Sequence, residues 1–400
     1  MRRLRFILPI AAAALTLAIV TAASARPSHT HSATAAQVVN CNGPLKIAMV
    51  TPLTGGAGFL GNEQLSWAKY AVKTLQRRYG LKIQLLTGDT PVEQGPAPAQ
   101  ALAQKFIADP RVVAILGPST SGAVAASSAA YFAAGLVHVS ESATRTQLTK
   151  PVGGQPRQAT AGFFRVVADD GIQGPNDANY MISKLHVKKV AIFDFQEPYS
   201  QGIAADTETT LKAKGVTTTR LSAPNTTTDY SSYVSRISGD TDVVFVPTQK
   251  PGDAQTIAEQ LAEQGKKAKV FGTDGSNNPA QFKFPGSYVS NFAAPINLFP
   301  YNKAIIAGWK RDNPGKEIGS FGPPTYGATQ VIFSALQQAC AKYHGKLPNR
   351  RVLIPEVKRV RIHNWILGGD FRFSTRTNDP FNGRFYIFQI QSNGTYKLVQ

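Results

Sequence analysis

The sequence predicts an α/β fold made of two doubly wound lobes, each with its own parallel sheet. Its 400 residues are too many for one compact core, so two lobes are expected. From Leu45 onward, short apolar runs alternate with segments of helical length, which is typical of βαβ units around a parallel sheet. After residue 176 the same alternation starts again and adds the second lobe. The composition, 42% hydrophobic and 17% charged, is that of a globular protein.

The first lobe is expected to begin with a short apolar strand and a glycine-rich turn, GGAGFLG (55–61). In the helix that follows, apolar residues from Leu65 to Leu75 recur at helical spacing, and Gly80 ends the helix. The expected elements of this lobe are the strands 45–51, 81–89, 112–116 and 136–140 and the helices 62–80, 98–109 and 123–132.

The second lobe is expected to repeat the alternation of strands and helices up to about residue 275, after which the pattern changes. Two late helices, 301–312 and 325–345, have no strand between them, so we expect the chain to return to the first lobe and pack there. Antiparallel strands around the hairpin signal SNG (392–394) close the chain. The expected elements are the strands 188–195, 241–248, 268–275, 370–374, 383–391 and 395–399 and the helices 200–215, 231–238 and 253–265.

Residues 1–25 have the features of a signal peptide. The start MRRLRF is basic, the run ILPIAAAALTLAIV is apolar, and the small residues ASA (23–25) favour cleavage after Ala25. An uncleaved membrane anchor is the alternative, but the apolar run is short for a bilayer span. No cysteine follows the run directly, so a lipid-anchor signal is missing, and residues 26–43 are expected to form a flexible leader. We therefore expect an exported protein, periplasmic or extracellular.

The net charge is strongly positive. Without Arg2, Arg3 and Arg5 of the signal peptide, the formal charge of +19 becomes +16. An exported protein meets little nucleic acid, so we expect no nucleic-acid partner. The densest basic cluster, RRVLIPEVKRVR (350–361), is either a solvated face or a surface attracted to anionic lipid, wall polymer or a membrane partner.

Cys41 and Cys340 are the two cysteines of the chain. In an oxidising compartment they can form a disulfide that ties the mature N-terminus to a late helix, and the alternative is two inert thiols. Their spacing has no metal-ligand pattern, and the six scattered histidines add none. We therefore expect no metal and no cofactor.

The stretch GPSTSG (117–122) places hydroxyl groups where strand 112–116 ends and a helix begins, at the sheet edge where α/β folds bind ligands. A nucleophile elbow needs G-x-S-x-G, and Ser121 occupies the place of the second glycine. A phosphate loop fails as well, because G-K-[ST] does not follow. A plain helix cap and an anion cradle, in which backbone N–H groups and hydroxyls bind a carboxylate, both remain open. The turn SESATRTQ (140–147) adds a second set of donors.

An amino-acid zwitterion also needs an acid for its ammonium group, because a buried cation must be paired. Asp170 in ADDGIQG and Asp274 in GTDG lie at turns that face the expected cleft. Each is equally open to interpretation as a helix cap or an Asx turn. Tyr199 in EPYSQG is placed to lie on a ligand.

Seven motifs, taken in this order, resemble the leucine/isoleucine/valine-binding proteins from about Leu45 to the C-terminus. They are IAMVTPLTGGAGFLGNEQLSWAKYAV, VVAILGPSTSGAVAASS, VHVSESATRTQLT, FFRVVADDGIQG, VAIFDFQEPYSQG, VFVPTQKPGDAQTIAEQLAEQG and GTDG. The resemblance implies the type I periplasmic binding fold, in which three crossovers join two α/β lobes at a hinge. Lobe 1 would then comprise 44–167 and 294–368, and lobe 2 would comprise 168–293 and 369–400.

The resemblance also implies how each end of a ligand is held. The chain departs from the family at two positions, with Gly122 in place of a serine and Gln249 in place of an aromatic wall residue. These departures are compatible with α-amino-acid binding, but they do not support a preference for branched-chain amino acids. The implied positions are Ser121 and Gly122 for the α-carboxylate, Ser142, Ala143 and Thr144 for both ends of the zwitterion, Asp170 and Asp274 for the ammonium, Tyr199 on the lid, and Leu60, with Phe59 beside it, at the aromatic position of the first turn.

By this resemblance the chain is an exported solute-binding protein of an ABC importer and not an enzyme. As a monomer it would close like a hinge on a small zwitterion, an L-amino acid, and deliver it to an ABC permease. The same fold used as a receptor or sensor for amides, urea or aromatic acids is the alternative. Two further hypotheses are a cell-surface protein attracted to polyanions and a secreted hydrolase, which needs a reactive serine.

Overall fold

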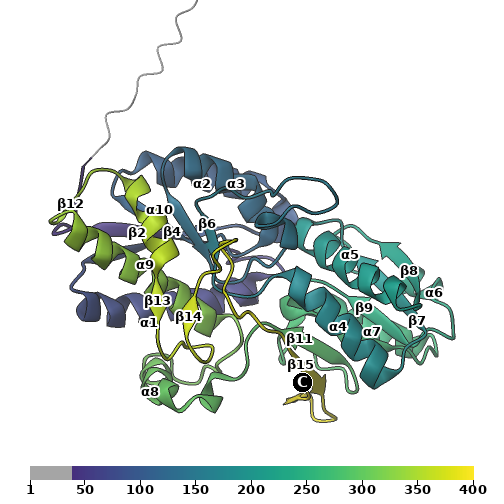
Figure 1. Cartoon of the computed structure of the whole chain (residues 1–400). Helices are drawn as coiled ribbons and strands as arrows, with labels where there is room; N and C mark the ends of the chain where they lie inside the picture. The colour runs from purple at the N-terminus through teal and green to yellow at the C-terminus, as the bar shows by residue number, and fades with distance from the viewer. Residues whose placement is uncertain (1–37) are drawn as a thin grey trace, which may run out of the picture. The chain divides into compact units, whose positions relative to one another are not determined.

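The computed structural model describes residues 38–400, which form two α/β lobes, as predicted (Figure 1). The expected signal peptide, its cleavage after Ala25 and most of the expected leader lie outside the described residues. Among the helices of residues 38–400, none is long and apolar enough to cross a membrane.

The first lobe is built on a five-stranded parallel sheet with the strand order β3-β2-β4-β5-β6. Its strand β2, which pairs with β3 on one side and β4 on the other, is buried at every residue because helices pack on both faces. Ala48 of β2 lies opposite Leu86 of β3 and Ile115 of β4. The elements are β2 (Leu45–Thr51), β3 (Ile83–Asp89), β4 (Val112–Leu116), β5 (Val137–Ser140), β6 (Phe163–Arg165), α1 (Gly58–Tyr79), α2 (Ala97–Ala108) and α3 (Ser121–Ala133).

The second lobe has a seven-stranded sheet with the order β16-β15-β11-β10-β9-β7-β8. Its first five strands in the chain are parallel, and β15 and β16 add an antiparallel hairpin at one edge, as the SNG signal predicts. The elements are β7 (Lys189–Asp194), β8 (Thr217–Ser222), β9 (Val243–Val246), β10 (Lys269–Gly272), β11 (Tyr288–Asn291), β15 (Tyr386–Ile390), β16 (Tyr396–Leu398), α4 (Asp170–Leu185), α5 (Pro198–Ala213), α6 (Ser231–Ser235) and α7 (Pro251–Glu263).

The chain returns to the first lobe after β11, as the two late helices predict. Trp309 of α8 (Lys303–Asp312) stacks on Trp67 of α1 with ring centroids 4.9 Å apart. Helix α9 (Gly322–Lys342) packs along α1, and it starts with a glycine because a Cβ at Gly322 would lie 1.9 Å from the Trp67 ring. The helix α10 (Leu353–Arg359) completes this layer.

A short antiparallel pair, β13 (Arg361–Ile362) with β14 (Phe371–Arg372), also belongs to the first lobe. Phe371 and Phe373 are buried in the same hydrophobic core as α1 and α9. The predicted boundary between residues 368 and 369 falls inside this pair. The segment through Phe373 therefore lies with lobe 1, because its aromatic side chains fill that core.

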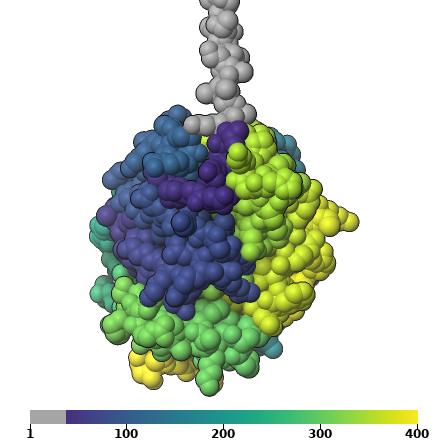
Figure 2. Space-filling view, turned by 90° about the vertical axis from the view of Figure 1, so that its left-hand side faces the viewer, coloured from purple at the N-terminus to yellow at the C-terminus, as the bar shows by residue number. Residues whose placement is uncertain are grey.

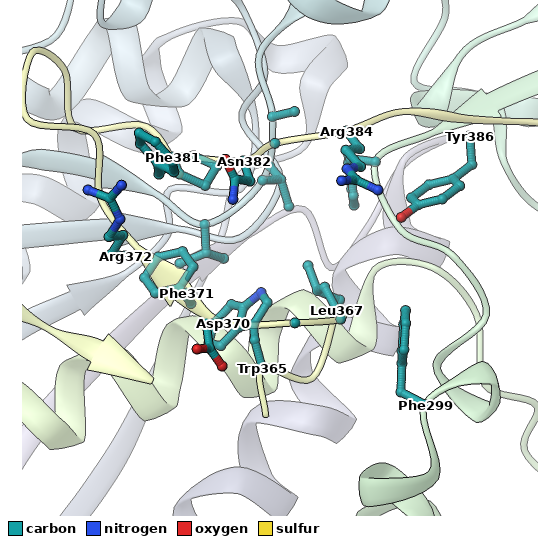
Figure 3. A pocket seen from close by; sticks show the side chains of 18 residues that line it. Phe299, Trp365, Leu367, Asp370, Phe371, Arg372, Phe381, Asn382, Arg384 and Tyr386 are labelled. Atoms are coloured by element: carbon teal, nitrogen blue, oxygen red, sulfur yellow. The ribbon is translucent and has the colours of Figure 1, made fainter. Parts of the chain in front are cut away.

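Three segments cross between the lobes, after β6, after β11 and between β14 and β15. They line a cavity of about 250 Å³, into which Trp365, Phe371 and Arg384 project (Figure 3). Trp365 stacks on Phe371 with ring centroids 4.3 Å apart. This is the three-crossover hinge that the resemblance implies.

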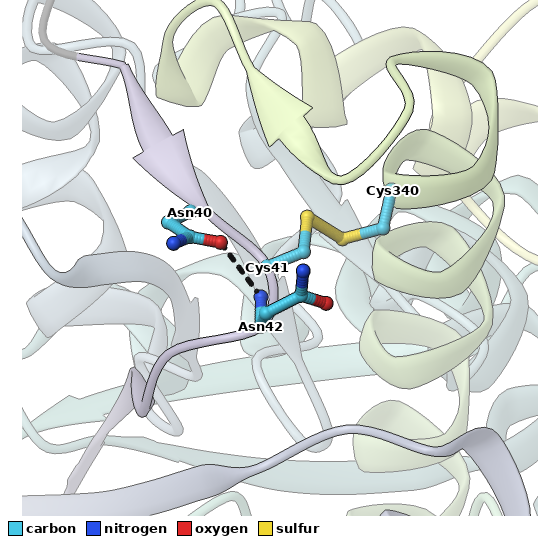
Figure 4. The surroundings of a disulfide bond; sticks show 4 residues. All are labelled: Asn40, Cys41, Asn42 and Cys340. Carbon is cyan, nitrogen blue, oxygen red and sulfur yellow. Dashed lines mark hydrogen bonds between the residues drawn. A yellow bond between two sulfur atoms is a disulfide. The ribbon is translucent and has the colours of Figure 1, made fainter.

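Cys41 and Cys340 form a disulfide and are not two inert thiols (Figure 4). Next to it, β1 (Val39–Asn40) pairs with β12 (Lys346–Leu347), so the last residues of the expected leader are part of the fold. Figure 2 shows this N-terminal segment lying against the later, yellow-green segments.

The basic cluster at 350–361 has a structural role that neither sequence interpretation anticipates. Arg350 donates to the carbonyl oxygens of Ile107, Asp109, Val112 and Ala134 at 3.3 Å. In the same cluster, Arg351 donates to the last carbonyls of α3, and Lys358 donates to carbonyls of the segment after β14. These cations give additional donors to carbonyl groups at helix ends, at the start of β4 and in loops.

Candidate functional site

The start of α3 combines a helix cap with free donor groups. Thr120 is the N-cap, and its hydroxyl oxygen accepts a hydrogen bond from Ala123 N at 3.4 Å. Ser121 Oγ accepts from Arg145 N at 3.1 Å. An α-helix leaves its first N–H groups without intrahelical partners, and here these belong to Ser121 and Gly122. Capping therefore explains Thr120, and the N–H groups of the next two residues remain for an anion.

The second turn lies directly beside the first. Ser142 Oγ donates to Ser119 O at 2.7 Å and accepts from Gln64 Nε2 at 2.8 Å, so this hydroxyl holds the two turns together. Thr144 differs, because its buried Oγ1 has no hydrogen-bond partner within residues 38–400. The carbonyl oxygen of Thr144 accepts from Asp170 N at 2.8 Å, which brings this turn to the start of α4.

Both predicted acids are buried, and neither is a helix cap. Asp169 caps α4, and Thr273 caps the single 3₁₀ turn that begins at Asp274. Asp170 is fully buried, and neither carboxylate oxygen has a hydrogen-bond partner among the described residues. The hydroxyl of Tyr199 lies 2.7 Å from Asp274 Oδ1, to which it donates.

The two carboxyl groups destabilise each other in their ionised forms. Burial, with the negative charge of Asp274 adding to it, raises the pKa of Asp170 well above its usual value. Burial also raises the pKa of Asp274 to about 6, although the hydrogen bond from Tyr199 partly offsets this. A cation placed between them would relieve both the burial cost and the repulsion.

Hydrogen bonds between the lobes close the cleft over this site. The predicted site residues other than Gly122 are at most 5% exposed: Leu60, Ser121, Ser142, Ala143, Thr144, Asp170, Tyr199 and Asp274. The inter-lobe bonds include Arg145 Nη1 to Pro198 O at 2.7 Å, Thr146 Oγ1 to Asp206 Oδ2 at 2.6 Å and Asn225 Nδ2 to Val92 O at 3.2 Å.

Two cavities lie between the lobes near the cradle. One, of about 390 Å³, is lined by Gly122 and also by Gln249 and Thr90; sequence analysis did not single out Thr90, which carries no motif. The other, of about 590 Å³, is lined by Phe59. Leu60, predicted at the aromatic position of the first turn, lies in the hydrophobic core of lobe 1 and lines neither of these two cavities. Neighbouring helical residues point about 100° apart, so the cavity wall takes Phe59 instead.

The serines at these turns are buried, so none of them is accessible as the nucleophile that a hydrolase needs. Ser119 is buried and donates to the buried Glu141. Ser128 Oγ lies 2.7 Å from His138 Nε2, but both side chains are buried in the core, and burial lowers the pKa of His138 to about 4. The described residues also contain no group of three or more His, Cys, Asp or Glu side chains that could hold a metal ion.

The comparison with known families agrees with this cleft between two parallel-sheet lobes. The family described as "Periplasmic binding protein" matches residues 44–395. The chain belongs to this family. Its members are extracytoplasmic binding proteins and not enzymes, as expected, and the chain is a solute-binding protein of the kind that serves ABC transporters.

The relatives of this periplasmic binding protein confirm the resemblance to the leucine/isoleucine/valine-binding proteins. The leucine-specific-binding protein of Salmonella typhimurium is 25% identical over 309 residues, which are 74% of this chain and 80% of that protein. The crystal structure of a leucine binding protein from Thermotoga maritima superposes with a TM-score of 0.78 at 20% identity, covering 89% of this chain and 98% of that one.

Other solved structures with the same fold hold different ligands. A solute-binding protein of R. palustris in complex with benzoate superposes with a TM-score of 0.76 at 16% identity, covering 89% of this chain and 96% of that one. At these identities the likeness establishes the fold, and the ligand of this chain has to be argued from its own residues.

Proposed function

We propose that this periplasmic binding protein binds an L-amino acid between its lobes and delivers it to an ABC permease. The observation that carries the proposal is the Asp170 carboxyl group, fully buried beside Asp274 with both oxygens unpartnered within residues 38–400. A buried carboxylate without a partner is costly. The ammonium group of an amino acid supplies the missing donors and a compensating charge.

The two ends of the ligand have separate partners in this arrangement. The α-carboxylate accepts from the N–H groups of Ser121 and Gly122 and from the Thr144 hydroxyl, and the positive end of the α3 dipole favours its charge. The ammonium lies between Asp170 and Asp274. Because the carboxylate partners are on lobe 1 and both acids are on lobe 2, one zwitterion ties the lobes together.

Hinge closure follows from this division of partners. The ligand-binding groups of each lobe are exposed to water when the cleft opens and are enclosed when it closes. The bound zwitterion replaces that water with fixed donors and acceptors, so it favours the closed form by its differential affinity for the two forms. The inter-lobe contacts of Arg145 and Thr146 add to closure only when the lobes meet.

A ligand panel tests the proposal. We expect L-amino acids to raise the melting temperature of the mature protein, and their amides, which lack the carboxylate, and their decarboxylated amines to raise it far less. A ligand at a hundred times its dissociation constant adds about 2.7 kcal/mol of stability. A shift with benzoate or urea and none with amino acids would contradict the proposal and favour the alternative receptor, for which the two buried acids are unfavourable.

The Asp170→Asn variant measures the contribution of the Asp170 carboxylate to ligand binding. It should weaken binding of the stabilising amino acid by about 1.5–3 kcal/mol, the value of a hydrogen bond to a charged group. The melting temperature of the ligand-free protein should not fall, because the replaced carboxylate has no partner in residues 38–400. Asp312→Asn is the control, since Asp312 pairs with Lys73 outside the cleft.

A further inference from the structure

The cavity beside Gly122 contains two polar side chains that nothing in the ligand-free cleft uses. It has a volume of about 390 Å³, and its wall comes from both lobes. Thr90 follows β3 on lobe 1, and Gln249 lies between β9 and α7 on lobe 2. Gly122 lines the same cavity, so this space adjoins the start of α3, where the proposed α-carboxylate partners lie.

Thr90 lines the cavity and carries a buried hydroxyl that is unsatisfied. The residue is 4% exposed, and its backbone N–H donates to Thr51 O at 3.1 Å, which fixes its position at the end of the strand. Its Oγ1 is buried and has no hydrogen-bond partner anywhere in residues 38–400. Nearly all buried hydroxyls in proteins are hydrogen-bonded, so this one indicates a missing partner.

Gln249 presents a free amide from the opposite lobe. It is 7% exposed, and the hydrogen bonds of its turn join Thr248 to Asp253 and to Lys250 N instead. Among the hydrogen bonds of the described chain, none uses the Gln249 amide. A Cβ added at Gly275 would lie 3.1 Å from Gln249 Cα, so this turn passes directly behind the Asp274 site.

The rest of the lining is apolar or already engaged. Val92, Pro198 and three alanines of α3 contribute hydrocarbon surface. The acidic group of the lining, Glu197, accepts from Tyr199 N and Ser200 N and so caps α5. The cavity therefore offers hydrocarbon contact for methylene groups and uncharged hydrogen bonding at Thr90 and Gln249.

We propose that the ligand is an L-amino acid with a side-chain carboxamide, held by Gln249 and Thr90; this rests on the proposed function. A carboxamide has both a donor and an acceptor, so it pairs reciprocally with the Gln249 amide and leaves one further bond for the hydroxyl. An aliphatic side chain of the same shape leaves both protein groups buried and unpaired. Sites built to hydrogen-bond a substrate reject analogues that lack the group.

Two pairs of amino acids of matched shape test the proposal by titration calorimetry on the mature protein. L-Asparagine and L-leucine have the same branching, and L-glutamine and L-methionine have the same length. We expect the better carboxamide ligand to bind at least about tenfold more tightly than its apolar counterpart. Gln249→Met should remove or reverse this ratio. Thr90→Val, which keeps the shape, should reduce it.

The control is Gln104→Met, an identical change at an exposed position of α2, which should leave the ratio unchanged. Tighter binding of L-leucine or L-methionine to the unchanged protein, or a ratio unaffected by Gln249→Met, would overturn the carboxamide assignment and leave amino-acid binding intact. If no amino acid of any kind binds, the proposed function fails and this assignment fails with it.

Discussion

Asp170 and Asp274 make the folding stability of the ligand-free protein decrease as pH rises. Burial raises the pKa of Asp274 to about 6 and that of Asp170 well above its usual value, whereas the unfolded chain keeps both near about 4. When the folded pKa is the higher one, the stabilising contribution is present below the unfolded pKa and is lost as pH rises through the folded pKa. Burial raises the pKa of Glu63 and Glu141 to about 7, which acts in the same direction.

We therefore expect the melting temperature of the ligand-free protein to fall as pH rises from about 5 to about 7.5. Affinity for an amino acid should change in the opposite sense, because the ammonium group needs the carboxylates in their ionised form. Calorimetric titration and thermal unfolding across this range measure both effects. The same affinity at both ends of the range would argue against Asp170 and Asp274 as partners of the ammonium.

The sequence predicts the position of a residue in a turn better than that of a residue whose orientation depends on helix phase. Asp170, Thr144 and Asp274 follow short apolar runs, and the end of such a run fixes which edge of the sheet a residue occupies. Leu60 lies in the lobe 1 core while its neighbour Phe59 lines a cavity, because a shift of one residue on a helix turns the side chain by about 100°. Thr90 directly follows β3 and carries no motif, and its unpaired hydroxyl is found only in the structure.

At the scale of elements, the helices and strands whose residues give a weak local signal are not predictable from the sequence. Helix α4 contains two glycines and Pro175 in its first two turns, residues that lower helix propensity. The edge strand β8, TTTRLS, is mostly polar and exposed, and β6 has only three residues. Tertiary contacts stabilise them instead: α4 packs along α5, and β8 pairs with β7.

A buried ion pair ties one of these short elements to the third crossover. Arg165 of β6 is fully buried and donates through Nε to Asp379 Oδ1 at 2.6 Å, and Thr149 Oγ1 donates to the same carboxylate at 2.9 Å. Burial alone would raise the pKa of Asp379, but Arg165 more than offsets it and lowers that pKa.

Arg165→Met should lower the free energy of unfolding by about 3–5 kcal/mol, because it leaves the Asp379 carboxylate buried without its cation. Urea denaturation measures the change. The double variant Arg165→Met, Asp379→Leu removes both charges and should recover part of the loss. A single variant as stable as the unchanged protein would show that water reaches Asp379, and that the pair does not hold β6 to the crossover.

At the scale of the whole molecule, the sequence predicted the return of the chain to lobe 1 because two amphipathic helices without a strand between them need an existing core. It did not predict where the return ends. Phe371 and Phe373 lie in a segment that the sequence also allows as the start of the last hairpin, and their burial in the lobe 1 core, with the pairing of β13 and β14, assigns it to lobe 1. Local sequence thus determines whether a segment forms a helix or a strand. The lobe in which that segment packs depends on contacts with residues that are distant in the chain.

The disulfide joins the segment before the first lobe strand β2 to helix α9 of the returning chain. Cys41 and Cys340 are 299 residues apart, and between them the chain builds most of both lobes and returns. A cross-link across such a loop restricts the unfolded chain more than the folded one, so its removal typically costs about 2–5 kcal/mol. The cysteines lie beside β1 and α9 and line none of the cavities near the cradle.

We therefore expect the double variant Cys41→Ser, Cys340→Ser to unfold at a lower denaturant concentration while its affinity for the stabilising amino acid stays unchanged. Denaturation should be followed by circular dichroism and by tryptophan fluorescence, since Trp67 and Trp309 both lie in the lobe 1 core. The fluorescence transition reports lobe 1 and should move by at least as much as the circular dichroism transition. An unchanged fluorescence midpoint would mean that β1, α9 and their core contacts hold the returning chain in place without the disulfide.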